Sequence, residues 1–143
     1  MTKFWLGLEK HNSLHINKIN MEKTRSYSKK INRFCYSING KYYSDKECRK
    51  KMPKDLLQFF DWSKIEKTSG RKDFNGEEIF EGDIIHDLHY VGHGKSQHYY
   101  EVVLKDDKFY MVSTTGVVQR DFENFTFTSE KVIGNINQNL DLL

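Results

Sequence analysis

Short runs of aromatic and β-branched residues, each ended by turn-forming residues, constrain the fold of this chain more than any other feature. The clearest case is Asn39-Gly40, which separates residues 31–38 from residues 41–43. An Asn-Gly pair between two such runs is the strongest short-range signal of a β-hairpin, because both residues tolerate the positive φ angles of a type I′ turn. Alternation puts three residues of the first run on one face: Phe34, Tyr36 and Ile38.

The same pattern repeats from residue 69 onward, whereas residues 1–30 fit neither the helical nor the strand period. In residues 1–30 we expect a strand and then an irregular or helical piece. Several strands at a spacing of about ten residues are typical of a small β-barrel or β-sandwich. The expected turns are at 73–76, 105–108 and Gly116, and the expected strands are 77–80, 84–85, 99–104, 109–112, 117–118 and 131–136.

Two short helices are predicted between the hairpin and the later strands. The run Ser44-Asp45-Lys46-Glu47 has the pattern of a capping box, and the basic residues 49–51 suit the end of a helix. Pro53 ends that helix, and the spacing of Leu56, Phe59 and Phe60 predicts an amphipathic helix over 54–62. The predicted fold class is therefore α+β and mainly β, with a barrel-like or sandwich-like C-terminal domain preceded by a hairpin and short helices.

The composition excludes several classes of protein. The chain has 143 residues, the size of one domain with an appendage, and its 14% aromatic residues argue against wholesale disorder. No apolar run approaches the roughly 20 residues that a membrane-spanning helix needs, and the first ten residues lack the apolar stretch of a secretory signal. Two cysteines, Cys35 and Cys48, cannot form a disulfide framework. We therefore expect a reduced, cytoplasmic protein.

Charge divides the chain into two regions. Residues 1–68 hold 16 Lys and Arg against 7 Asp and Glu, whereas residues 69–143 hold 7 against 13. This asymmetry predicts a boundary near Thr68-Ser69-Gly70, with a basic region at 1–68 and a β domain at 69–143. A basic region attracts phosphates or an acidic protein surface. Two alternatives stay open: the regions pack together and neutralise each other in part, or the lysine content reflects genome composition.

Basic and aromatic residues alternate in the first region and form the candidate partner-binding site. Such a surface can stack on single-stranded nucleic acid or anchor a protein partner. The alternative is a hairpin with one buried aromatic face and one lysine-rich solvated face. An exposed aromatic face also leaves a homo-oligomer open. The candidate residues are Lys29, Lys30, Arg33, Tyr36, Lys41, Tyr42, Tyr43, Arg49, Lys50 and Lys51.

No residue pattern predicts catalysis, and we expect neither a cofactor nor a bound metal. The histidines His86, His89, His93 and His98 are close enough in sequence to close a metal site, but Gly92, Gly94 and Ser96 make an exposed loop the better interpretation. The carboxylates Glu78, Glu81, Asp83 and Asp87 are interpreted as an acidic solvated edge rather than an acid–base pair. Cys35 and Cys48 lack an activating motif, and we expect them in a strand and a helix respectively.

Two motifs resemble the signature of the YopX family, whose members are small proteins of phages and prophages. Residues 69–84 read SGRKDFNGEEIFEGDI, close to the family's Thr-Gly, Lys-Asp-x-Asn-Gly and Glu-Ile-Tyr-Glu-Gly-Asp-Ile. Residues 132–136 read VIGNI, with Asn139 and terminal leucines after it. The resemblance covers about 69–143. Residues 1–68 depart from it, because the usual initial Arg-Ala-Trp-Asp-like strand is missing and Phe59-Phe60-Asp61-Trp62 is not the usual polar-aromatic segment.

The resemblance implies a β-rich fold and a phage or prophage origin, hence the cytoplasm of an infected or lysogenic bacterium. It brings no catalytic residues, and its motif residues would be structural. Gly76 and Gly82 would form turns. Asn75 and Asp83 would hydrogen-bond local backbone. The core residues would be Ile79, Ile84 and Ile133.

Three functional hypotheses follow. The first is a non-enzymatic phage protein that binds a host protein, for example an antiviral nuclease such as a CRISPR effector or its nucleic-acid complex, and blocks it sterically. The second is a nucleic-acid-binding accessory protein, and the third is a metal-dependent enzyme that uses the cluster His86–His98. We rank them in that order.

Overall fold

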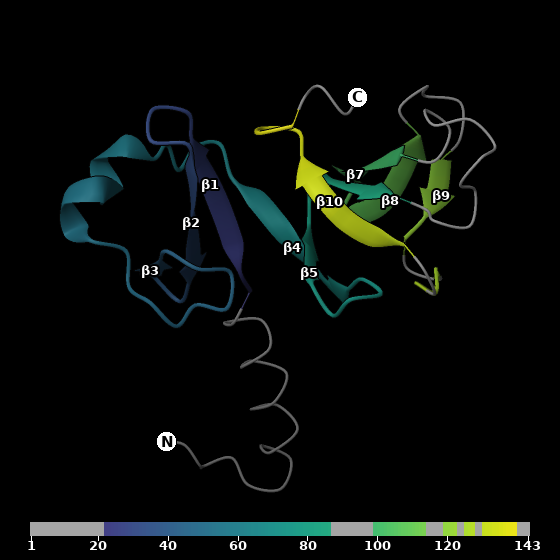
Figure 1. Ribbon diagram of the computed structural model, residues 1–143, viewed down its shortest axis with the longest axis horizontal. Coiled ribbons are helices and arrows are strands. Elements are labelled where there is room, and N and C mark those ends of the chain that lie inside the picture. The colour runs from purple at the N-terminus through teal and green to yellow at the C-terminus, as the bar shows by residue number, and fades with distance from the viewer. Residues whose placement is uncertain (1–21, 87–98, 114–118, 123–124, 128–129, 140–143) are drawn as a thin grey trace, which may run out of the picture.

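Two antiparallel five-stranded sheets lie beside each other in the protein (Figure 1). The computed structural model describes residues 22–86, 99–113, 119–122, 125–127 and 130–139. The strand order is β3-β2-β1-β4-β5 in the first sheet and β10-β6-β7-β8-β9 in the second. The prediction of a mainly β fold is confirmed. The described strands form an open, sandwich-like arrangement rather than a closed barrel.

The first sheet is built around the predicted hairpin. Its strands are β1 (Thr24–Ser28), β2 (Arg33–Ile38), β3 (Lys41–Tyr43), β4 (Glu66–Lys72) and β5 (Glu78–Phe80). The pair Asn39-Gly40 joins β2 to β3 with φ angles of 53° and 75°, so the predicted turn is confirmed. The middle strands β1 and β4 pair with each other, which places the predicted boundary near Thr68 inside a strand that contacts both regions.

The second sheet contains most of the strands expected after residue 80. They are β6 (Asp83–His86), β7 (Tyr99–Lys105), β8 (Lys108–Ser113), β9 (Gln119–Asp121) and β10 (Lys131–Asn135). The predicted break at 105–108 is a tight turn in which Asp106 and Asp107 take φ angles of 54° and 63°. The turn expected at Gly116 and the strand expected at 117–118 lie outside the described residues.

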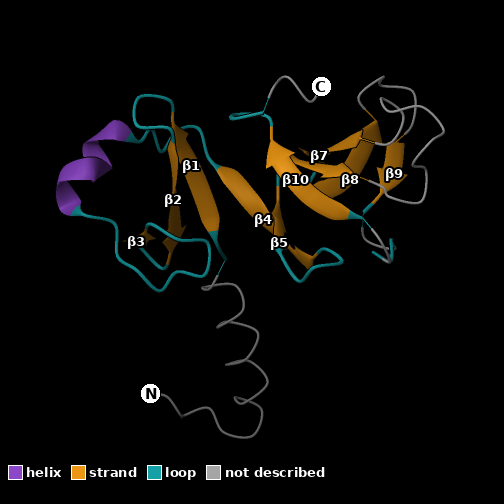
Figure 2. Ribbon diagram, viewed as in Figure 1, coloured by secondary structure: helices purple, strands orange, loops and turns teal. Residues whose placement is uncertain are grey.

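The first predicted helix is wrong, and the second is correct in position only. Residues 44–50 form a loop in which Asp45 accepts hydrogen bonds from the backbone N–H groups of Arg49 and Lys50 at 2.7–3.1 Å. Cys48 has a φ of 60°, which no right-handed helix allows. The Asp45 side chain, which was predicted to be part of a helix cap, therefore closes a loop. The second segment is the 3-10 helix η1 (Lys54–Phe59) at the outer edge of the first sheet (Figure 2).

Two separate hydrophobic clusters hold the described chain together. The larger lies against the second sheet and includes Ile79 from β5. The smaller joins β2 to η1 and its flanks through Cys35, Met52 and Phe60. Of the core residues expected from the family motifs, Ile79 and Ile84 are fully buried, whereas Ile133 is half-buried.

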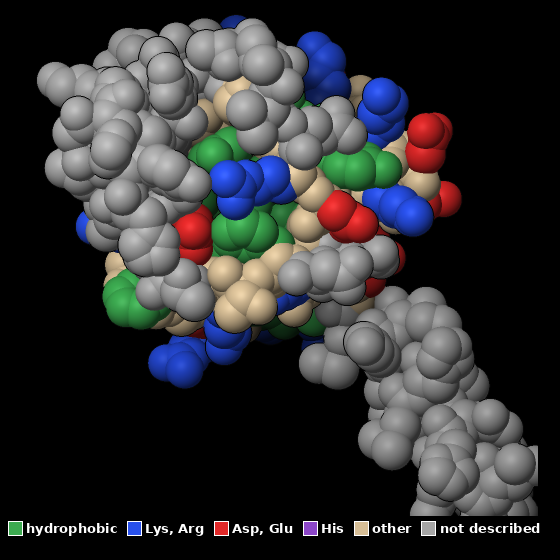
Figure 3. All heavy atoms as spheres, turned by 90° about the vertical axis from the view of Figure 1, so that its right-hand side faces the viewer, with side chains coloured by type: hydrophobic (Ala, Val, Ile, Leu, Met, Phe, Trp, Pro, Cys, Tyr) green, Lys and Arg blue, Asp and Glu red, His purple; other side chains and the backbone are tan. Residues whose placement is uncertain are grey.

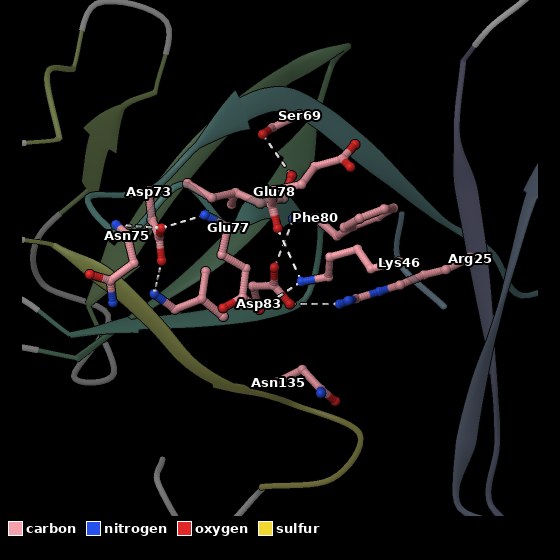
Figure 4. A network of polar contacts seen from close by, with 12 residues as sticks. Arg25, Lys46, Ser69, Asp73, Asn75, Glu77, Glu78, Phe80, Asp83 and Asn135 are labelled. Carbon is pink, nitrogen blue, oxygen red and sulfur yellow. Dashed lines mark hydrogen bonds and ion pairs between the residues drawn. The ribbon is translucent and has the colours of Figure 1, made fainter. Parts of the chain in front are cut away.

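A buried arginine connects the two sheets. Arg25 on β1 is 2% exposed, and its guanidinium lies between the rings of Phe34 and Phe80, 4.1 and 4.7 Å from their centres. Its Nε donates to Glu66 Oε1 and its Nη2 to Asp83 Oδ1, each at 2.8 Å (Figure 4). Asp83, at the start of β6, also accepts the N–H of Phe80 at 2.8 Å, as the motif predicted. One cation therefore ties β1 to β4 and to the second sheet.

The remaining signature residues form two hydrogen-bonded turns. Asp73 accepts the backbone N–H groups of Asn75, Glu77 and Val132, each at 2.8 Å, and thereby fastens the β4–β5 hairpin to β10 (Figure 4). Asn75 was expected to bond through its side chain, but here it contributes its backbone N–H, because Asp73 already caps the turn. Near the end of the chain, Asn135 Oδ1 accepts the N–H groups of Asn137 and Gln138. The signature residues are therefore structural.

Gly82 lies where neither a positive φ nor the available space suits another residue. Its φ is 87°, and a Cβ there would lie 2.2 Å from Glu66 Oε2, on the carboxylate that Arg25 holds. At Gly70 the φ is 75° and nothing lies within 4 Å of a Cβ. Gly70→Ala should therefore lose only the conformational cost of a positive φ, about 1–2 kcal/mol. Gly82→Ala should lose about 1–3 kcal/mol more of the free energy of unfolding in urea. Equal losses would show that Glu66 is not fixed.

Candidate binding site

The basic residues of the candidate site are on the surface but do not form one patch. Lys29 and Lys30 lie in the β1–β2 turn, whereas Lys41 follows Asn39-Gly40 at the opposite end of β2. The remaining basic candidates, at 49–51, lie in a segment that folds back on β3, where Tyr43 pairs with Lys51. The exposed members are Lys29, Lys30, Arg33, Lys41, Arg49, Lys50 and Lys51.

The aromatic members of the candidate site belong partly to the interior. Tyr36 is 7% exposed and packs edge-on against Phe80, with ring centres 5.7 Å apart. Tyr42 is half-buried and packs on Trp62 at 5.1 Å, in the smaller hydrophobic cluster. Tyr43 is also half-buried. Aromatic side chains on both faces of the hairpin are thus used for folding, and the lysines around them remain at the surface.

Among the described residues, three basic side chains of the first region form salt bridges with acidic side chains of the second. Lys23 binds Glu78 at 2.7 Å, and Lys46 binds Glu77 at 2.8 Å. Together with the Arg25–Asp83 pair, these contacts confirm that the two oppositely charged regions neutralise each other in part. Part of the sequence asymmetry is therefore internal to the fold. Only the cations outside these pairs are available to a partner.

A groove of about 550 Å³ lies beside the β1–β2 turn, at the junction of several separate segments. Three lysines border it: Lys29 and Lys30, both predicted, and Lys64. Its apolar lining comes from Tyr27, Phe59 and Ile65. The Nζ of Lys30 lies 5.1 Å from the centre of the Phe59 ring.

Only two residues of the groove, Lys29 and Lys30, were predicted from the sequence to bind a partner. The groove forms from residues 27–30, 59–66, Glu81 and Asn137, which are distant in sequence. They are brought together partly by Ser26, whose Oγ donates to the carbonyl of Asp61 at 3.0 Å. The unusual exposure of Ile65, at 39%, is visible only once the fold is known.

The carboxylates that line the groove are held by neighbouring donors. Glu66 accepts hydrogen bonds from Arg25 and Asn137, and Glu81 accepts one from the backbone N–H of Lys67. Asp61 accepts the N–H and the hydroxyl of Ser63, which lowers the pKa of its carboxyl. Burial raises the pKa of Glu66, although Arg25 opposes part of that shift. In contrast, no described carboxylate forms an ion pair with Lys29, Lys30 or Lys64.

The other candidate centres offer little chemistry within the described residues. No group of three or more His, Cys, Asp or Glu that could hold a metal occurs there. His86 stacks on Tyr99 at 4.8 Å, whereas His89, His93 and His98 lie outside the described part. Cys35 lies in a strand as predicted, and Cys48 in a loop rather than the predicted helix. Burial raises the pKa of the Cys35 thiol to about 11, the opposite of what an activated cysteine requires.

Comparison with known proteins supplies the context for this site. A family model described as YopX protein matches residues 5–143. The chain belongs to the YopX family. The match extends through residues 5–68, so the region that we expected to depart from the family is part of it. YopX membership makes this a phage-type protein, as the two motifs implied. Comparison with curated proteins gives no match.

In this YopX chain the second-sheet side of the molecule also carries exposed charged side chains, for example at the β7–β8 turn. Figure 3 shows that face, where Lys and Arg side chains are interspersed with Asp, Glu and hydrophobic side chains. Across the described residues, no helix is both long and apolar enough to cross a membrane. The groove beside the β1–β2 turn combines predicted basic residues with apolar side chains and is the candidate site.

The buried hydroxyl of Tyr36 should make stability depend on alkaline pH. Burial raises its pKa from 10.0 to about 12, so the folded state keeps a proton that the unfolded chain releases. The resulting stability is complete below pH 10 and is lost as the pH rises toward 12, by about 2–3 kcal/mol. Urea titrations between pH 8 and 11.5 should show a shallower decline for Tyr36→Phe than for the wild type. Parallel declines would contradict the burial of this hydroxyl.

Proposed function

We propose that this protein is a non-enzymatic binding protein that a phage produces to act on a host protein. The observation that carries the proposal is the groove beside the β1–β2 turn. There, Lys29 and Lys30, which form no ion pair with a described carboxylate, line the groove together with Lys64 and the apolar side chains of Tyr27, Phe59 and Ile65. Exposed cations beside an apolar surface are suited to bind a protein, and the carboxylates of the groove accept hydrogen bonds from neighbouring groups of the protein.

The concrete form that we favour is inhibition of an antiviral nuclease, such as a CRISPR effector, by steric occlusion. Membership of the chain in a phage-type family supports a host protein as its target. The rigid attachment of the groove supports a mechanism by occlusion, because Arg25 fixes β1 against both β4 and the second sheet. A preorganised surface loses little conformational entropy on binding.

Nucleic-acid binding is the second candidate. The position of Lys30 over the Phe59 ring is the observation that favours it, since charge next to an aromatic face is typical of single-strand binding sites. The two candidates differ in salt dependence, because release of counterions makes nucleic-acid binding fall steeply with salt.

The lysines of the groove should be necessary for capture of a host protein. We expect the tagged full chain to retain a host protein from nuclease-treated lysates of bacteria in which the phage replicates. The variant Lys29→Gln/Lys30→Gln should lose most of it, with an affinity on the order of tenfold lower. The matched control is Lys105→Gln/Lys108→Gln, which removes two exposed lysines from the β7–β8 turn. Equal retention by the two variants would contradict the assignment, as would retention that disappears on nuclease treatment.

A further inference from the structure

We infer that the groove binds an acidic peptide segment of the partner, with one large apolar side chain inserted between the lysines. This inference rests on the proposed function and specifies the chemistry of the ligand. It follows from the size of the groove, the state of its charges and its apolar floor.

The size of the groove fits a short segment of chain. Its volume of about 550 Å³ falls within the roughly 300–1,000 Å³ of sites that enclose drug-sized ligands. Such a space takes one large side chain and its neighbours rather than a flat protein surface. Two of its segments are joined in the free protein, because the Oγ of Ser26 on β1 donates to the carbonyl of Asp61, a residue of the lining, at 3.0 Å.

The charges around the groove favour carboxylates in the ligand. Lys29, Lys30 and Lys64 are exposed and have no ion pair with a described carboxylate. Glu66 and Glu81 accept hydrogen bonds from neighbouring groups of the protein, which reduces their competition for these lysines. Asp61 interacts with the charge of Lys64, so Lys29 and Lys30 are the lysines most open to a ligand. Carboxylates on a peptide can therefore bind Lys29 and Lys30 first and compete with Asp61 for Lys64.

The floor of the groove favours an apolar side chain between those carboxylates. Ile65 is 39% exposed, and it is one of the two large hydrophobic residues exposed in the described chain. Tyr27 and Phe59 complete the floor. Covering these three side chains releases ordered water, which stabilises a complex by about 25 cal/mol per Å² of apolar surface buried.

The same lining disfavours a nucleic-acid strand. A strand carries a phosphate at every nucleotide, so its charge would pass over Asp61, Glu66 and Glu81 as well as over the lysines. Burial of such like charges against each other costs affinity. A peptide avoids this cost because its carboxylates can be spaced on either side of an uncharged residue.

The test is selection of random 12-residue peptides on the full-length wild-type protein, followed by fluorescence polarisation with the enriched peptides. We expect enrichment of Asp and Glu around one aromatic or large aliphatic residue. Ile65→Ser and Lys64→Gln should each weaken binding about tenfold. Phe74→Ser, which alters the other exposed large hydrophobic residue, outside the groove, should leave binding unchanged. Thermal unfolding of each variant establishes that it is folded.

Several outcomes would overturn the inference. They are enriched peptides without acidic residues, equal effects of Ile65→Ser and Phe74→Ser, and displacement of the peptide by a 12-nucleotide single strand at lower concentration. Self-association in light scattering that Ile65→Ser abolishes would instead assign the groove to a second copy of the chain. Failure here is separable from failure of the proposed function. A host protein retained through Lys29 and Lys30, but unaffected by Ile65→Ser, would leave that function intact and reject the acidic apolar ligand.

Discussion

The buried ion pair between Arg25 and Asp83 is the contact on which the arrangement of this molecule depends. Both side chains are at most 2% exposed, and the arginine also binds Glu66 and lies between two aromatic rings. A charge without a partner in such a place would cost several kcal/mol, so the two sheets are stable together in one relative position. The hydrophobic clusters supply less of this specificity, because the smaller one lies within the first sheet and its flanks, and the larger one reaches the first sheet through Ile79 of β5.

Residues of the YopX signature contribute to this ion pair and its surroundings. Gly82 leaves room for the Glu66 carboxylate, Asp83 provides the counterion, and Asp73 ties the preceding hairpin to β10. These signature residues thus build the junction between the two sheets. The groove that we propose as the binding site shares Glu66 with this junction, so the same contacts that join the sheets also fix one wall of the site. A few polar residues therefore hold both the junction between the sheets and one wall of the proposed binding site.

Sequence patterns predicted the elements whose buried residues are apolar and whose turns are chemically distinctive. Asn39-Gly40 and the strands around Val102 are examples. They did not predict β1 and β4, the central strands of the first sheet. The buried side chains of β1 are Arg25, Ser26 and Ser28, and β4 contains no large apolar residue, so neither strand has a hydrophobic period to detect. The capping box at 44–47 failed because Asp45 bonds a loop instead of a helix. The groove combines four distant segments, and no local pattern could reveal it.

Arg25 and Asp83 stabilise the fold through the ion pair that they form with each other. A double-mutant cycle measures this directly: the free energy of unfolding is determined in urea for the wild type, Arg25→Met, Asp83→Asn and the double variant. We expect a coupling energy between Arg25 and Asp83 of at least about 2 kcal/mol, because each single change leaves a buried polar group without its partner. The exposed pair Lys67–Glu22, measured with Lys67→Met and Glu22→Gln, should couple by less than about 1 kcal/mol. Additive effects at Arg25 and Asp83, or a coupling no larger than that of the exposed pair, would contradict the account.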